Sequence, residues 1–70
     1  MKLIHFLSPT HMQAAFNALG GAGFEPQTKY VPQTAQHPCG YVIYGENIDS
    51  MHLFLVEHQY RNNGVKDWEV

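Results

Sequence analysis

The tetrapeptide His37-Pro38-Cys39-Gly40 contains the residues with the clearest chemical potential in this chain of 70 residues. Cys39 is the only cysteine, and the thiolate form of a cysteine is a nucleophile. His37 lies two residues earlier and favours the thiolate if the chain turns its ring toward the sulfur. Gly40 lacks a side chain, which leaves room for a bulky group to approach the sulfur. These residues predict a thiol site, and the alternative is a buried cysteine that packs as a small hydrophobic residue.

The other polar residues form no recognisable catalytic or metal-binding pattern. Among the five histidines no pair has the three- or four-residue spacing that places two ligands on one helix face. His37 and Cys39 together offer two ligands, whereas a protein metal site needs three or four. No serine lies in a nucleophile elbow, and the six acidic residues show no paired arrangement. We therefore predict a protein that is not an enzyme, with no catalytic residue, no metal and no cofactor.

The first half of the chain is expected to form a strand, a helix and a second strand. Lys2–Leu7 is an apolar run of strand length, which is typical of a central strand buried on both faces. Ser8 is a suitable N-cap, and Pro9 suits the first helical position, where no N–H is needed. Apolar residues then repeat at helical spacing up to the glycine-rich residues 20–23, which end the helix. The second strand is Gln27–Val31, which is followed by a proline.

The second half is expected to form a loop, a strand, a helix and a final strand. Residues 32–38 contain two prolines and little to bury, which indicates an exposed loop. Residues 39–44 form the clearest strand, and Asn47 can cap the second helix. The residues expected to face inward from this helix are Ile48, Met51, Phe54, Leu55 and His58. Asn62-Asn63-Gly64 end the helix, and residues 65–70 form the last strand.

This order of elements predicts the fold class. Two right-handed crossovers joined by a hairpin give an α+β, ferredoxin-like β-α-β-β-α-β sandwich. Two helices then cover one face of a four-stranded antiparallel sheet, and residues 1–70 form one domain. The opposite face needs a cover, for which Val42, Tyr44, Tyr30 and Trp68 are candidates. Because a sheet with one bare face often pairs with a second copy, and because 70 residues bury only a small core, we expect a homodimer.

Composition narrows the classes of partner. Four Lys and Arg residues against six Asp and Glu give a net charge of −2 with no basic cluster, which argues against direct nucleic-acid binding. No apolar run approaches the roughly 20 residues of a membrane-spanning helix, and no signal peptide is recognisable. With its single thiol, the chain is expected to be cytoplasmic. The chain has only 14% charged residues and 13% aromatic residues, so its surface is expected to carry few charges, which suits a protein partner. The residues expected to contact that partner are Tyr30, Tyr41, Tyr44 and Trp68.

A longer pattern surrounds the cysteine. It consists of a strand ending in Phe6 and Ser8, then His11, an alanine-containing helix through Leu19, Gly23-Phe24, Pro32, and Cys39-Gly40 before Tyr41-Val42-Ile43. Over residues 1–45 this pattern resembles the family of small bacterial selenium or sulfur carrier-like domains. The family has an arginine after its loop proline, where this chain has Gln33. The resemblance implies a ferredoxin-like fold and a carrier role for Cys39.

A shorter pattern points elsewhere. Residues 1–8 and His11 are similar to the start of an anti-CRISPR protein encoded by phages, and the likeness ends near Met12. We therefore carry two hypotheses. The first is a non-enzymatic carrier or adaptor domain that holds a sulfur or selenium species on Cys39, assisted by His37 and Gly40. The second is a protein-binding inhibitor or regulatory module, such as a phage-encoded one, that acts by occupying the surface of its partner.

Overall fold

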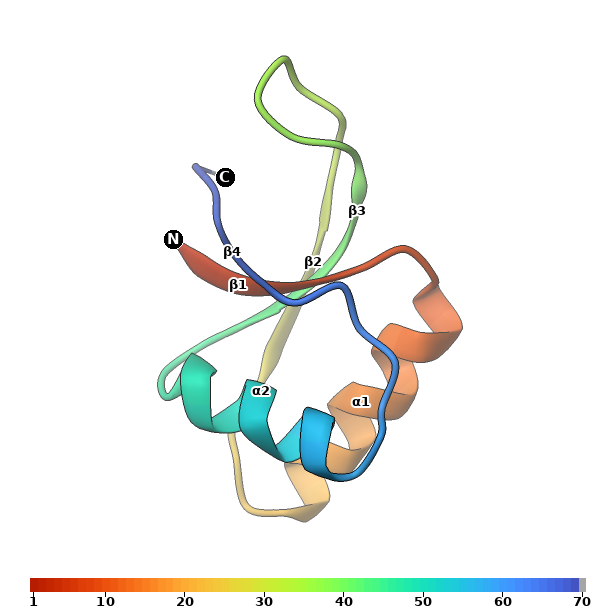
Figure 1. The fold of residues 1–70 in the computed structure, drawn as a ribbon, viewed down its shortest axis with the longest axis vertical. Helices are drawn as coiled ribbons and strands as arrows, with labels where there is room; N and C mark the ends of the chain where they lie inside the picture. The colour runs from red at the N-terminus through yellow and green to blue at the C-terminus, as the bar shows by residue number, and fades with distance from the viewer. Residues whose placement is uncertain (70) are drawn as a thin grey trace.

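Four strands and two helices follow one another in the predicted order in the computed structural model, which describes residues 1–69 (Figure 1). They are β1 (Lys2–Phe6), α1 (Pro9–Gly21), β2 (Gln27–Val31), β3 (Gly40–Tyr44), α2 (Ile48–Glu57) and β4 (Val65–Asp67). The strands form one antiparallel sheet in the order β2-β3-β1-β4. Both helices lie on the same side of this sheet (Figure 1). The ferredoxin-like α+β arrangement is therefore confirmed.

β1 is one of the two central strands and is buried on both sides. It pairs with β3 along one edge and with β4 along the other. Because successive residues of a strand point to opposite faces, Ile4 and Phe6 face the helices, whereas Leu3 and His5 face away from them. All four side chains are buried, as the sequence predicts for this run.

The main core lies between the sheet and the helices. Ala15 and Leu19 from α1 and Met51 and Leu55 from α2 are fully buried, each pair separated by one helical turn. The complete set of buried residues in this core is Ile4, Phe6, Ala15, Leu19, Ile43, Ile48, Met51 and Leu55. Burial of each large apolar side chain contributes about 1.5–3 kcal/mol, so this layer supplies most of the driving force for folding.

The opposite face of the sheet is partly covered by the chain itself. Leu3, Val31 and Val42 are buried there, and Tyr44 and Trp68 pack against them. The Trp68 N–H donates to the Met1 carbonyl at 3.0 Å, and the Met1 amino group donates to the Trp68 carbonyl at 2.9 Å. The structure thus places Val42, Tyr44 and Trp68 on this face, as expected. Tyr30, the fourth candidate, instead lies on the helix side of the sheet, where it contacts Tyr41.

Both helices end in the same hydrogen-bonding pattern. After α1, Gly23 has a φ of 94° and the Phe24 N–H donates to the Leu19 carbonyl. After α2, Gln59 has a φ of 61° and the Tyr60 N–H donates to the Leu55 carbonyl. These are Schellman motifs, in which a residue in the left-handed region turns the chain. The prediction that α2 extends to Asn62 is wrong because Gln59 takes a conformation that glycine or asparagine more commonly adopts.

The two helix starts differ. The Ser8 Oγ accepts a hydrogen bond from the His11 N–H at 3.4 Å, and Pro9 occupies the first turn, as predicted. Asn47 precedes α2 but has a φ of 62° and makes no capping hydrogen bond through its side chain. Asn47 thus lies at the predicted N-cap position of α2, but the expected capping by its side chain is wrong, and the residue serves as a left-handed turn. Of the final strand predicted over residues 65–70, the structure has Val65–Asp67, and Val70 lies outside the described residues.

The left-handed backbone at Asn47 predicts how substitutions there change the stability of the protein. Asn47→Ala should lower the free energy of unfolding by about 1 kcal/mol, because a β-carbon other than that of Asn or Asp is costly in this region. Asn47→Gly should leave it within about 0.5 kcal/mol, since no side-chain cap is lost. Urea denaturation followed by circular dichroism measures both. A Gly variant that is as destabilised as the Ala variant would indicate a capping role.

Candidate functional site

The hairpin formed by β2, β3 and residues 32–39 extends away from the helices. In Figure 1 the loop of this hairpin lies at one end of the long axis of the molecule, with α1 and α2 toward the other end. Residues 32–39 contain no helix or strand. Cys39 immediately precedes β3, and its side chain is exposed. The alternative of a buried cysteine is therefore wrong.

Cys39 lies beside a pair of tyrosines, and we refer to Tyr30 and Tyr41 as the tyrosine face. Tyr30 in β2 is directly opposite Tyr41 in β3, and their ring centroids are 5.3 Å apart in an edge-to-face arrangement. The Tyr30 side chain is 54% exposed, whereas Tyr41 is half-buried against the main core. α1 packs on β3 and β1, and α2 packs on β1 and β4, so the outer end of the hairpin stays open to solvent.

The Cys39 sulfur affects the ionisation of the Tyr30 hydroxyl. Negative charge on Cys39 is the main cause that raises the pKa of Tyr30 above its ordinary value. Desolvation and a side-chain hydrogen bond with Cys39 raise this pKa further, and Tyr41 adds a smaller effect. The phenol of Tyr30 therefore stays protonated to higher pH and remains a hydrogen-bond donor next to the sulfur.

His37 is turned toward Trp68. Its ring stacks on the Trp68 indole with 4.5 Å between centroids and 10° between planes, and only 7% of the residue is exposed. Its Nδ1 lies 3.1 Å from the Pro38 carbonyl oxygen and can donate to it. No hydrogen bond joins the His37 ring to the Cys39 sulfur among residues 1–69. The expected assistance of His37 to a thiolate at Cys39 thus has no contact to support it.

Gly40 has a packing role that the sequence does not reveal. A β-carbon at this position would overlap the His5 imidazole and lie 2.9 Å from the Phe6 carbonyl oxygen. The His5 Nε2 is 3.3 Å from the Cys39 carbonyl oxygen, to which it donates in the matching tautomer. The His5 ring therefore fills the space left by the missing side chain. The expectation that Gly40 gives a bulky group access to the sulfur is wrong.

His5, Trp68 and His37 form an aromatic stack that sequence reasoning missed. The His5 and Trp68 centroids are 4.9 Å apart, and His37 contacts the same indole. The alternation of β1 indicates that His5 faces away from Ile4 and Phe6, but it does not show what covers His5. That information depends on where the residues after β4 pack in three dimensions. The stack holds the loop of the hairpin against the C-terminal residues and so fixes the backbone at Cys39.

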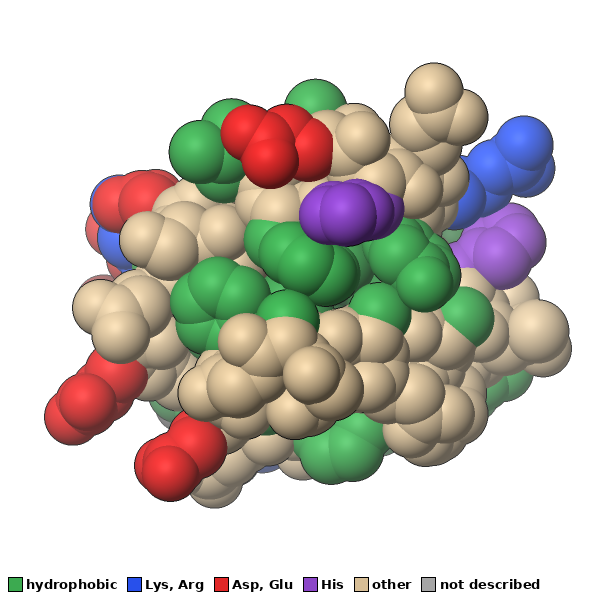
Figure 2. All heavy atoms as spheres, turned by 90° about the horizontal axis from the view of Figure 1, so that it is seen from below, with side chains coloured by type: hydrophobic (Ala, Val, Ile, Leu, Met, Phe, Trp, Pro, Cys, Tyr) green, Lys and Arg blue, Asp and Glu red, His purple; other side chains and the backbone are tan. Residues whose placement is uncertain are grey.

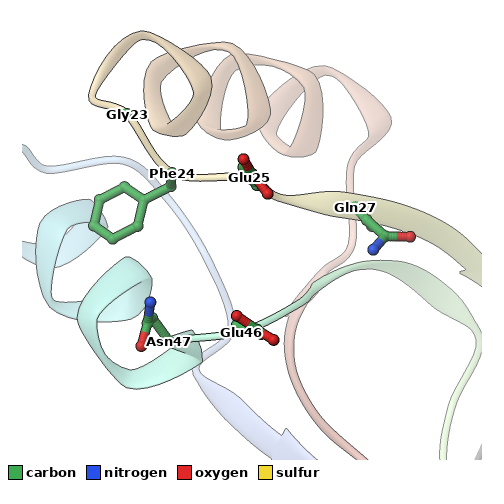
Figure 3. Close-up of a pocket in the computed structure, with 6 residues that line it drawn as sticks. All are labelled: Gly23, Phe24, Glu25, Gln27, Glu46 and Asn47. Atoms are coloured by element: carbon green, nitrogen blue, oxygen red, sulfur yellow. The ribbon is translucent and has the colours of Figure 1, made fainter.

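A polar hollow of about 400 Å³ lies at the other end of the sheet. It is formed between the segment after α1 and the turn before α2, and Glu25 and Glu46 border it from opposite sides (Figure 3). Among residues 1–69 no group of three or more His, Cys, Asp or Glu side chains has the arrangement of a metal site. The structure gives this hollow no further feature that identifies a ligand.

A second hollow, of about 260 Å³, lies beside the start of α1. His11 and Arg61 line it together with Phe6 and Ser8. The Ser8 Oγ is already engaged by the His11 N–H. The sequence gives no signal for this hollow, because Arg61 comes from the segment after α2 and reaches α1 only through the fold.

The helical side of the molecule also exposes apolar side chains. Leu53 and Val56 on α2 are 58% and 54% exposed. Phe54 packs edge-on against Phe24, and the His58 ring centroid is 4.3 Å from that of Phe54. Figure 2 shows hydrophobic side chains gathered in the middle of this face with a histidine beside them. Phe54 is partly buried against the main core, whereas His58 is exposed, so the prediction that His58 faces inward is wrong.

Comparison with known proteins gives no assignment. No protein-family model, no curated protein and no solved structure matches this chain. In the part of the chain that the structure describes, no helix has the length and apolar character to cross a membrane. The resemblances to carrier-like domains and to an anti-CRISPR protein therefore stay predictions from the sequence.

The contact between Gly40 and His5 predicts a specific loss of stability. Gly40→Ala should lower the free energy of unfolding by about 1–3 kcal/mol, because the new methyl group overlaps a buried ring. Gly20→Ala is the matched control, since a β-carbon there meets nothing within 4 Å and alanine favours the helix. Urea denaturation of both variants measures the difference. Equal stability of the two variants would contradict the packing role of Gly40.

The coupling between Tyr30 and Cys39 predicts a change in titration. Cys39→Ser removes the negative charge that raises the pKa of Tyr30, so this pKa should fall toward its ordinary value. The phenol would then lose its proton at lower pH than in the wild-type protein. Site-resolved NMR titration of the tyrosine rings measures the shift, with Tyr60, for which the structure shows no contact with Cys39, as the internal control. An unchanged Tyr30 titration in this variant would exclude the proposed contact.

Proposed function

We propose that this domain is a non-catalytic module that binds a protein partner through the tyrosine face. The observation that carries the proposal is the contact between an exposed Tyr30 and a half-buried Tyr41 on a hairpin that extends beyond the helices. Tyrosine is enriched at protein interfaces because its ring provides apolar contact area and its hydroxyl provides a hydrogen bond. The Tyr30 phenol is exposed and can donate or accept a hydrogen bond with a partner.

The architecture of the hairpin supports this proposal. Gly40 seats His5, and the stack of His5, Trp68 and His37 fixes the loop before Cys39. A surface that is ordered before binding loses less conformational entropy when a partner docks. The proposal covers both adaptor and inhibitor roles, because both require occupation of a partner surface and neither requires a catalytic residue.

A second candidate function is that Cys39 carries sulfur or selenium. The observation in its favour is the exposure of the Cys39 side chain at the end of the loop. As a sulfur carrier, the Cys39 thiolate would attack the outer sulfur of a donor persulfide, form a persulfide on Cys39 and release the donor as its thiolate. The Tyr30 hydroxyl would be the nearest hydrogen-bond donor to the sulfur. The carrier function requires the Cys39 sulfur, whereas protein binding through the tyrosine face requires the Tyr30 ring.

Two substitutions separate the candidates. For a partner isolated with the wild-type domain, Tyr30→Ala should weaken binding by about 2 kcal/mol, which is roughly 30-fold in Kd. Leu53→Ala, at a residue of similar exposure on the helical side, should change Kd less than about twofold, as should Cys39→Ser. Calorimetry measures these affinities. A Kd unchanged by Tyr30→Ala would overturn binding through the tyrosine face.

The carrier candidate has its own readout. Intact mass of gently purified protein, with and without a reducing agent, shows whether Cys39 holds a reducible sulfur or selenium adduct. An adduct that is absent from Cys39→Ser would favour the carrier. A bare thiol at Cys39 in protein taken from its native host would count against it.

A further inference from the structure

β2 forms one edge of the sheet and has a free outer side. It pairs with β3 alone, and four of its five residues are exposed. In the described residues, its backbone makes no hydrogen bond to a loop, a helix or a side chain. In an antiparallel edge strand, alternate N–H and C=O groups point away from the sheet. β2 thus presents a row of unpaired donors and acceptors to solvent.

The other edge of the sheet offers much less. β4 has three residues, Val65–Asp67. α2 also packs against β4. The edge at β2 is therefore the one with length and access for another strand.

We infer that the outer edge of β2 accepts an extended segment of a partner protein, which adds to the sheet as a fifth strand beside the tyrosine face. This inference rests on the proposed protein-binding function and specifies its mode. An extended polypeptide is the ligand whose donors and acceptors repeat at the spacing of a strand edge. Proline at position 26 and at position 32 bounds the edge, so the added strand pairs over Gln27–Val31.

Charge selects the sequence of the added strand. Lys29 is the middle residue of β2 and lies opposite Val42, on the face away from the helices. Lys29 and Glu69 both line a hollow of about 180 Å³. Within residues 1–69, however, Lys29 forms no salt bridge. An acidic residue of the partner directly across from Lys29 would be favourable, as opposite charges are in cross-strand pairs. The opposite face of the added strand would contact Tyr30 and Thr28, which suits an aromatic or β-branched residue.

A second copy of this chain is a less suitable occupant. Full antiparallel overlap of two β2 strands about a two-fold axis places residue 27 opposite 31 and residue 28 opposite 30. It therefore places Lys29 of one copy opposite Lys29 of the other. Like charges directly opposite each other destabilise a strand pair. The charge at this edge thus favours an acidic segment of a different protein over self-pairing.

Selection from a phage-displayed library of linear random peptides of about eight residues tests the inference. Enriched peptides should carry Asp or Glu at one central position, with aromatic or β-branched residues beside it and no central proline. Adding such a peptide to the full chain should slow hydrogen exchange of the β2 amides that face outward, as measured by NMR. Lys29→Glu should lower the affinity of the domain for that peptide by about five- to tenfold. The Lys29→Glu variant should instead bind more tightly to the same peptide with a central Lys. Lys66→Glu, the same charge change at the other edge, is the matched control and should change its affinity less than about twofold.

Three results would overturn the inference. The first is failure to enrich any peptide, and the second is enrichment of peptides that leave β2 exchange unchanged. The third is a stable dimer in sedimentation equilibrium with β2 amides already protected, which would assign the edge to a second copy. None of these results removes the proposed function, because loss of partner binding in Tyr30→Ala would still support binding by the tyrosine face through side chains alone. If Tyr30→Ala leaves Kd unchanged while the peptide protects the β2 amides, strand addition at β2 is supported and binding through the tyrosine face is overturned.

Discussion

Burial of β1 on both sides is the constraint on which the rest of the structure depends. Two helices cover one side of the sheet, and residues 1–69 form no third helix for the other side. There the indole of Trp68 packs against the cluster of Leu3, Val31 and Val42, with His5 and His37 against its ring. This arrangement buries a histidine in the middle of the sheet, and it requires glycine at position 40, where the ring of His5 lies. The position of Cys39 on the surface follows from that packing.

The order of the elements and the central place of β1 follow from the sequence. The apolar run of Lys2–Leu7, the Ser8-Pro9 pair and the helical repeat through Leu19 are strong local signals, and all agree with the fold. The end of α2 is not predictable in the same way, because Gln59 is an unusual residue for a left-handed turn. Asn47 illustrates a related limit: its type suits both a cap and a left-handed turn, and the backbone decides between them.

The candidate site was less predictable than the fold. Exposure of Cys39 agrees with its place after a polar loop, but the roles of its neighbours depend on contacts between distant segments. His37 and Trp68 are far apart in sequence, so their stacking carries no local pattern. Gly40 contacts His5 because of the register between β1 and β3, and a shift of register would place another residue there. Local spacing alone therefore pairs His37 with Cys39, whereas the structure pairs it with Trp68.

The stack of His5, Trp68 and His37 also has a consequence for how folding can be followed. It joins the first strand, the hairpin loop and Trp68 after the last strand, so it can form only when the whole topology is in place. Contacts between segments this distant in sequence carry a high loop-closure entropy, which slows folding. Trp68 is the single tryptophan of the chain, so its fluorescence reports assembly of the complete fold and not of one local element.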